Sequence, residues 1–333
     1  MDEGMISSWV IAPLVASAAL GFYGYFHRYS HSRQRVLPPR RERVLIIGAS
    51  QGIGRAIAKR YAERGGSLCI VSRKDSELEA VRLDLEEIAS ASGWEDGAIA
   101  SFVADFTIAE ELVALRHALY EKWGGIDTLI VCAGVSATRA LLDIAGGEDD
   151  MEGPGVEGVQ QCAQAATKAL NGNYLGPLNT AVTMIPLMEK TSASPAIHLI
   201  SSLGAAVPAP TRSLYGSTKA GALALYQALA IEHPSITFSY ILPSTVQGLF
   251  RASAVDAESV PAGQENPAPE FNTDGLQPDA VAKRCIAAID KQEKLVFFPP
   301  FYAYAQLLYW LWPSYIEKKA AKKYGFERNV SES

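Results

Sequence analysis

The sequence has few residues of the kinds that bind metals or form disulfide bonds. It contains four cysteines and five histidines in 333 residues, and neither type shows the spacing of a metal site. There is no C-x-x-C pair, and Cys69 and Cys132 fall within apolar runs. We therefore expect no metal, and cysteines that are buried as small hydrophobic residues in a reducing compartment.

The sequence also has no excess of basic residues and no internal repeats. The formal net charge is −6 at pH 7, which gives no electrostatic reason to expect nucleic acid as a partner. With 48% hydrophobic residues, the chain is long enough to bury one large core.

Charge is absent from one long stretch near the N-terminus. Residues 4–26 contain no Asp, Glu, Lys or Arg, and as a helix they would extend about 34 Å, enough for a hydrocarbon core of about 30 Å. A cleaved signal peptide is the alternative, but Asp2 and Glu3 stand where a signal peptide carries basic residues. We predict a transmembrane anchor over residues 1–27. A basic linker over residues 28–42 then places the remaining chain in the cytosol by the positive-inside rule.

Short apolar runs alternate with amphipathic stretches from residue 43 onward, which predicts an α/β fold with a parallel sheet covered on both faces. Seven strands are expected, over residues 44–47, 68–71, 98–104, 128–133, 196–200, 236–242 and 294–298. Together they predict a single domain over residues 43–300. Residues 143–165 are predicted to be a surface loop, and residues 244–276 a long loop that covers the substrate site.

The C-terminal extension, residues 301–333, is first apolar and then basic. Residues 295–316 carry no charge, but prolines at 299, 300 and 313 leave too few helical residues to span a bilayer. Tryptophan and tyrosine with lysines behind them favour a helix on the membrane surface. The alternative is packing against the domain itself or against a second copy in a homodimer.

A glycine-rich turn follows the first predicted strand and opens a helix. It reads Gly48, Ala49, Ser50, Gln51, Gly52, Ile53 and Gly54, with Arg55 next. Residues without Cβ atoms let the backbone approach a pyrophosphate, and the helix start supplies free N–H groups. The same letters also fit the G-x-S-x-G turn of serine hydrolases, with Ser50 as nucleophile, although that turn normally follows several strands.

Charged residues after the second and third strands indicate which nucleotide is bound. Arg73 follows the second strand, where a cation pairs with the 2′-phosphate of NADP and an acidic residue would favour NAD. Together with Arg55, it favours NADP(H) over NAD(H). Asp105, after the third strand, would accept a hydrogen bond from the adenine amine.

Three polar residues have the spacing of a proton-transfer site. Tyr215 and Lys219 are four residues apart and leave one face of a helix, and Ser202 ends a buried strand shortly before them. A free tyrosine has a pKa of about 10. A nearby ammonium stabilises the phenolate and brings that pKa toward neutrality.

These motifs resemble the short-chain dehydrogenase/reductase family over residues 42–300. The resemblance is carried by the glycine turn, Cys132-Ala133-Gly134, Asn173, Ser202 and Tyr215-x-x-x-Lys219. The family implies a Rossmann-like doubly wound sheet. It also implies that Tyr215 is the general acid, that Lys219 lowers its pKa and holds the nicotinamide ribose, and that Ser202 polarises the carbonyl. Asn173 would hold a water of the proton relay, and Ala133 and Gly134 would lie beside the cofactor.

Some residues depart from the family pattern, which usually has Thr where Ile47 stands, Asn-Asn at Val131-Cys132, and Pro-Gly at Pro243-Ser244. None of these residues does chemistry, so the departures bear on cofactor affinity more than on reaction type. The local sequences around Cys132 and Asn173 resemble those of membrane-bound family members, and so do the apolar N-terminal and C-terminal segments of the chain. Examples of such members are 3-ketodihydrosphingosine reductases and hydroxysteroid dehydrogenase-like proteins of the member 7 type.

We therefore expect an NADP(H)-dependent oxidoreductase that transfers a hydride to or from a hydrophobic carbonyl or alcohol, lipid-, steroid- or retinoid-like. Its expected location is the endoplasmic reticulum membrane, as a single-pass protein. Two alternatives stay open: a non-catalytic nucleotide-binding scaffold at a membrane, and a serine hydrolase acting through Ser50.

Overall fold

The computed structural model describes residues 33–93, 98–146, 153–257 and 271–326. The anchor predicted over residues 1–27 lies outside these ranges. Among the helices within them, none is both long enough and apolar enough to cross a membrane.

The domain is built on one sheet of seven parallel strands in the order β3-β2-β1-β4-β5-β6-β7. The strands are β1 (Arg43–Ile47), β2 (Ser67–Ser72), β3 (Ile99–Val103), β4 (Thr128–Val131), β5 (Ala196–Ile200), β6 (Thr237–Pro243) and β7 (Leu295–Phe298). The strand order reverses between β1 and β4, as in doubly wound folds. All seven strands predicted from the sequence are present, so the predicted Rossmann-like sheet is confirmed.

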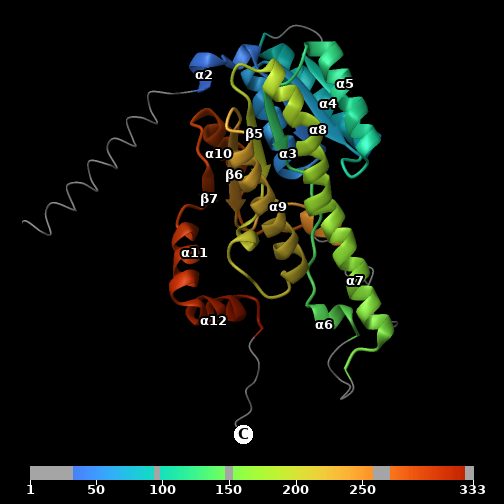
Figure 1. Ribbon diagram of the computed structural model, residues 1–333, viewed down its shortest axis with the longest axis vertical. Coiled ribbons are helices and arrows are strands. Elements are labelled where there is room, and N and C mark those ends of the chain that lie inside the picture. Colours follow the sequence, from blue (N-terminus) through green and yellow to red (C-terminus); the bar gives the residue numbers. More distant parts are fainter. Residues whose placement is uncertain (1–32, 94–97, 147–152, 258–270, 327–333) are drawn as a thin grey trace, which may run out of the picture.

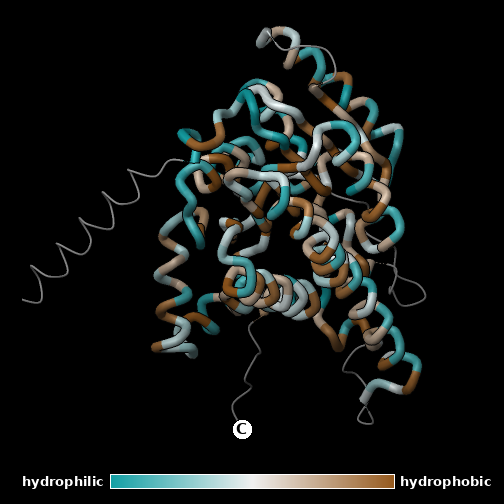
Figure 2. Tube along the Cα trace, turned by 45° about the horizontal axis from the view of Figure 1, so that its top comes forward, coloured by the Kyte–Doolittle hydropathy of each residue, from teal (hydrophilic) through white to brown (hydrophobic). Residues whose placement is uncertain are grey.

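Helices cover both faces of the sheet. One face carries α3 (Gly52–Arg64), α4 (Asp75–Ala91) and α10 (Pro278–Asp290), and the other carries α5 (Ala109–Trp123), α8 (Gly176–Thr191) and α9 (Ser213–Glu232). Successive residues of β1 face opposite cores: Val44 packs on the α3 side and Leu45 on the α8 side. In Figure 2 hydrophobic residues concentrate at the centre of the molecule, whereas the outer helices alternate in hydropathy. Both faces of the strands are therefore buried, which explains their continuous apolar runs.

One long helical unit runs from α7 (Val156–Leu170) through a π-helical turn (Asn171–Leu175) into α8. Glycines allow close packing there, because a Cβ on Gly176 would lie 2.4 Å from Phe106 Cε2. The loop predicted over residues 143–165 is wrong in its second half. A short helix α6 (Leu141–Ile144) precedes it, and α7 already begins at Val156.

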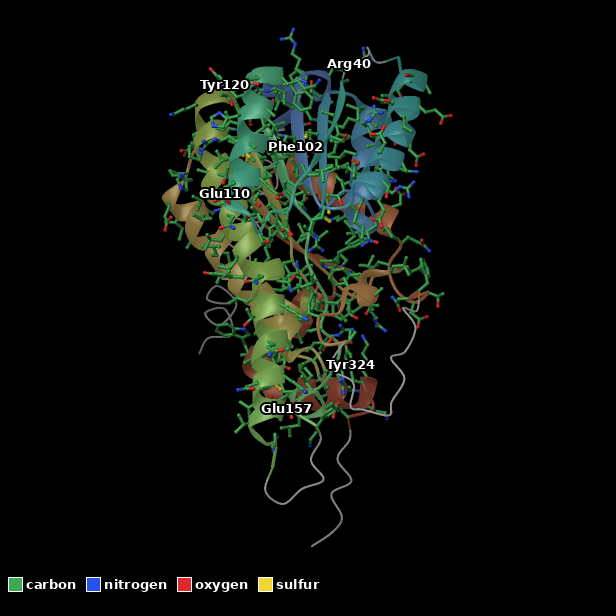
Figure 3. The ribbon with its side chains drawn as sticks, turned by 90° about the vertical axis from the view of Figure 1, so that its right-hand side faces the viewer. Arg40, Phe102, Glu110, Tyr120, Glu157 and Tyr324 are labelled. Carbon is green, nitrogen blue, oxygen red and sulfur yellow. The ribbon has the colours of Figure 1, made fainter. Side chains whose placement is uncertain are left out.

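The two ends of the described chain lie at opposite ends of the molecule. At one end, α2 (Arg33–Val36) and a 3-10 turn (Pro39–Arg41) attach the predicted linker to the domain. The buried Arg33 guanidinium there forms an ion pair with Glu42 at 2.5 Å. At the other end, α11 (Tyr302–Leu311) and α12 (Pro313–Lys323) lie near α6 and the start of α7. Figure 3 shows Arg40 and Tyr120 at the first end and Glu157 and Tyr324 at the second.

Candidate active site

A cleft of about 1230 Å³ opens at the carboxyl ends of the central strands. Its floor includes Ile47 of β1, Ile200 of β5 and Pro243 of β6. Its outer walls are residues 244–255, which include a 3-10 turn (Phe250–Ser253), and the inner faces of α11 and α12. The reversal of strand order beside β1 places the cleft where doubly wound folds bind ligands.

The glycine turn forms one end of the cleft. Gly48 has φ 89°, and a Cβ there would lie 2.6 Å from the Ala133 nitrogen. A Cβ on Gly54 would lie 2.0 Å from the Gly48 oxygen, so Gly54 packs α3 against the turn. Gly52, with φ 56°, faces open space. No side chain caps the start of α3, which leaves backbone N–H groups for an anion. The turn therefore fits a dinucleotide pyrophosphate.

The predicted nucleotide residues lie along this end of the cleft. Ser50, Gln51, Ile53, Arg55, Arg73, Asp105, Ala133 and Gly134 all line it. The Arg73 guanidinium is 3.7 Å from Asp105 Oδ2, and its side chain is 64% exposed. Arg55 instead pairs with Asp84 of α4, and its buried Nε has no partner in the described structure. Arg73 is therefore the cation better placed to meet a ribose phosphate, although Arg55 also lines this end of the cleft.

The catalytic residues predicted from the sequence meet at the middle of the cleft. Tyr215, in the first turn of α9, lies beside Ser202, which begins a 3-10 turn (Leu203–Ala205) after β5. The Ser202 hydroxyl accepts a hydrogen bond from the Gly204 N–H at 3.2 Å. Burial raises the pKa of Tyr215, and the Ser202 hydroxyl and the Arg212 guanidinium oppose that rise. The arrangement can hold a carbonyl oxygen between a hydroxyl and a phenol.

Lys219 lies one helical turn further along α9 and is buried. Its ammonium donates a hydrogen bond to the Ile200 carbonyl at 3.1 Å, and burial lowers its pKa to about 8. A Cβ on Gly134 would lie 3.1 Å from the Lys219 Nζ. The absence of a side chain at Gly134 therefore keeps the space beside this ammonium open.

Asn173 lies in the π-helical turn behind the catalytic residues and is completely buried. Its Oδ1 accepts a hydrogen bond from the Val135 N–H at 2.9 Å, and its Nδ2 donates to the Val135 carbonyl and the Thr218 hydroxyl. Both polar atoms of this side chain are engaged with protein. The side chain thus braces the segment after Gly134 against α9, and the role of Asn173 in holding a relay water stays a prediction.

Two residues near Tyr215 were not predicted from the sequence. Arg212 precedes α9, and its Nη1 donates to the Ala137 carbonyl at 2.9 Å. Phe250 packs edge-on against the Tyr215 ring, with centroids 5.9 Å apart. Arg212 was visible three residues before Tyr215, but Phe250 comes from a distant loop that only the fold brings near.

The serine hydrolase alternative receives no support from this site. Ser50 lines the cleft, but none of the residues described around the cleft is a histidine. His198, on β5, is fully buried in the sheet. Ser50 therefore has no imidazole base of the kind an activated serine requires.

A glycine cradle, a serine hydroxyl beside a phenol and a buried lysine define a nucleotide-dependent oxidoreductase. The profile of the short chain dehydrogenase family matches residues 42–258, and the chain therefore belongs to the short-chain dehydrogenase/reductase family. It is an NAD(P)-dependent oxidoreductase, as the sequence motifs predict.

Individual relatives agree with this assignment. The chain is 24% identical over 331 residues to dehydrogenase/reductase SDR family member 7B of Bos taurus, covering 98% of this chain and 94% of the relative. Its fold is similar to an alcohol dehydrogenase from Thermococcus sibiricus complexed with 5-hydroxy-NADP (TM-score 0.58, 23% identity, 77% of this chain and 94% of the other). It is also similar to a family member from Burkholderia phymatum in complex with NAD (TM-score 0.66, 17% identity, 84% and 96%).

Proposed function

We propose that this protein interconverts a ketone or aldehyde and the alcohol of a hydrophobic substrate, with NADP(H) preferred over NAD(H). The observation that carries the proposal is the meeting of Ser202, Tyr215 and Lys219 in the same cleft as the glycine turn. A nicotinamide cofactor supplies or accepts the hydride when bound. The chain's own residues then move the proton.

The proposed roles follow from the contacts. The Ser202 hydroxyl donates to the carbonyl oxygen, and the Tyr215 phenol gives that oxygen its proton in the reducing direction. Lys219, buried and with its pKa lowered to about 8, lies near Gly134, where it would hold the ribose hydroxyls. Asn173 keeps the Val135 backbone in place.

The hydrophobic nature of the substrate is inferred from the far half of the cleft. Its walls there come mainly from residues 244–255, α11 and α12, and the apolar residues that line this half include Val207, Leu249, Phe250, Tyr302 and Ile316. A substrate with an apolar body would displace water from these walls, which is favourable at about 25 cal/mol per Å². Preference for NADP(H) is supported by Arg73, which is exposed beside the cleft.

Membrane attachment is part of the proposal. The outer face of α11 and the turn after it expose large apolar side chains: Tyr304, Leu307, Leu308, Trp310, Leu311 and Trp312. Trp310 is 80% exposed. A continuous aromatic and aliphatic face of this kind fits the interfacial region of a bilayer. With the predicted anchor at residues 1–27, it would hold the cleft at the cytosolic face of the endoplasmic reticulum; a homodimer stays a prediction.

The variant Tyr215→Phe tests the proton-transfer role. It removes the phenolic hydroxyl while keeping the ring contact with Phe250. We expect cofactor affinity within about twofold of wild type and turnover lowered at least about a hundredfold, the lower range for loss of a general acid. Cofactor binding is measured by fluorescence titration, and turnover by NADPH absorbance with a panel of long-chain ketones, steroids and retinal. Near-normal turnover in this variant would contradict the proposal.

A further inference from the structure

The substrate half of the cleft carries a group of basic side chains that the proton-transfer chemistry does not use. Arg212, Arg251, Lys319 and Lys323 line it, from the start of α9, the 3-10 turn over the cleft and α12. Among the described residues that line the cleft, the only acidic one is Asp105, at the nucleotide end. In a chain of net charge −6, this concentration of positive charge needs an explanation.

The position of Arg212 links this group to the reacting centre. Its guanidinium donates to the Ser136 hydroxyl at 3.3 Å and to the Ala137 carbonyl at 2.9 Å, which holds it at the cleft wall. It is close enough to lower the pKa of Tyr215. Because Arg212 and Tyr215 both line the cleft, an anion bound by Arg212 would share the cleft with the carbonyl that Tyr215 protonates.

Among the described residues, the positive charge of Arg212 has a second positive charge, that of Arg251, as a neighbour. Burial and the charge of Arg251 both lower the pKa of Arg212. Among the carboxylates that the structure describes, the buried Asp256 favours the charged form of Arg212. However, Asp256 Oδ2 accepts hydrogen bonds from the backbone N–H groups of Thr138 and Arg139 at 2.7 and 2.8 Å. The charge of Asp256 is therefore shared with these backbone groups and is not devoted to Arg212.

The third part of the group comes from α12. Lys319 and Lys323 are four residues apart, with Ile316 and Ala320 on the same cleft-facing side. Lys318 and Lys322, on the same helix, do not line the cleft. The face turned to the cleft is therefore apolar at Ile316 and Ala320 and cationic beside them.

We propose that the substrate is an anionic amphiphile, whose carboxylate or phosphate binds to Arg212, Arg251, Lys319 and Lys323 while its apolar chain lies against α11 and the Phe250 turn. This inference rests on the proposed function for the carbonyl, and it adds a charged group near that carbonyl. Arginine pairs well with carboxylate and phosphate because its N–H groups match their oxygens.

Turnover of three related substrates, two anionic and one uncharged, tests the inference. The full chain is loaded with NADPH in nanodiscs of zwitterionic lipid and given γ-oxododecanoate, its methyl ester and γ-oxododecyl phosphate. We expect kcat/KM for at least one anion to exceed that of the ester by about tenfold, which corresponds to about 1.4 kcal/mol. Arg251→Gln and the double variant Lys319→Gln/Lys323→Gln should each remove most of that advantage, measured as the ratio of kcat/KM for the anion to kcat/KM for the ester in the same variant. The double variant Lys318→Gln/Lys322→Gln is the matched control and should keep it.

A binding measurement separates this inference from the proposed function. Dodecyl phosphate, dodecanoate and dodecanol are titrated against the NADP-loaded chain, with inorganic phosphate as a further arm. Tighter binding of an anion than of dodecanol, lost in Arg251→Gln, supports the inference even where no carbonyl is turned over. If inorganic phosphate bound as tightly as dodecyl phosphate, the apolar chain would contribute nothing to binding, and the proposal of an amphiphilic substrate would be overturned. Equal kcat/KM for the ester and both anions, or equal losses in the control variant, would overturn the anion site and leave the reductase standing.

Discussion

The Arg73 side chain makes the cofactor preference testable at a single residue. It is 64% exposed and approaches Asp105 only to 3.7 Å, so it is available for a ribose phosphate. Arg73→Asp replaces attraction by repulsion. We expect the KM for NADPH to rise at least about tenfold, or about 1.4 kcal/mol, with little change for NADH.

The neighbouring residue supplies the control for this prediction. Lys74 is more exposed, pairs with Glu77 at 2.7 Å and does not line the cleft. Steady-state kinetics with both nucleotides should show Lys74→Asp near wild type. Equal effects of Arg73→Asp on NADPH and NADH would argue against the preference.

Most catalytic residues could be predicted because their spacing is local. Tyr215 and Lys219 share one face of α9, and Ser202 ends a strand that the sheet must aim at the same edge. Arg251 could not be predicted in this way, because it approaches Arg212 only through the path of a loop. The ion pair of Arg55 with Asp84 could not be predicted either, because Asp84 lies on the neighbouring helix; the role of Arg55 toward the cofactor stays a prediction.

At the scale of elements, sequence patterns predict what is buried and miss what extends beyond the core. The strands were found because both faces are covered. The first turns of α7 were taken for loop because they follow a stretch rich in glycine and acidic residues. The apolar residues of those turns, Val156 and Val159, lie exposed beyond the core. Gly153-Pro154-Gly155 does end a loop, but the helix starts directly afterwards.

The exposed face of α11 gives a prediction at this scale. Leu311 is 74% exposed on that face. A spin label at Leu311→Cys in the full chain, reconstituted in phosphatidylcholine vesicles with a fraction of phosphatidylserine, should collide with oxygen more than with a water-soluble nickel complex. Apolar surface in the interfacial region excludes the polar reagent.

Ile231, near the end of α9, is the matched control because it is 82% exposed on a different helix. A label at Ile231→Cys should favour the nickel complex. Similar accessibility ratios at both positions would mean that α11 faces water, and the membrane contact would have to be abandoned.

At the scale of the whole molecule, the negative net charge reflects the outer surface and does not indicate the positive charge in the cleft. The acidic total comes largely from outer helices such as α4, which carries Asp75, Glu77, Glu79, Asp84, Glu86 and Glu87. The cleft collects cations because several distant segments turn their basic residues to one place. Composition therefore gave no reason to expect a nucleic acid partner, and it gave no indication of an anionic substrate either.

The buried His198 makes the stability of the whole domain depend on pH. It lies in the middle of β5, fully buried, with both ring nitrogens unpartnered in the described structure. Burial, and to a lesser extent Arg284, lowers its pKa to about 3, against about 6.5 in an unfolded chain. The unfolded state therefore binds the proton first as the pH falls, and stability is lost progressively from about pH 6.5 downward.

Replacing this histidine should remove that part of the pH dependence. Between about pH 7 and pH 5, protonation of His198 in the unfolded state should cost about 2 kcal/mol of unfolding free energy. Over this pH interval, we expect the unfolding free energy of His198→Leu to fall by about 2 kcal/mol less than that of the wild type. The unfolding free energy is measured by urea unfolding of the full chain in mild detergent. His117→Gln, at an exposed position on α5, should follow wild type. If His198→Leu kept the wild-type pH dependence, the ring would have to be charged or solvated in the folded protein, because a buried neutral imidazole cannot leave the linkage unchanged.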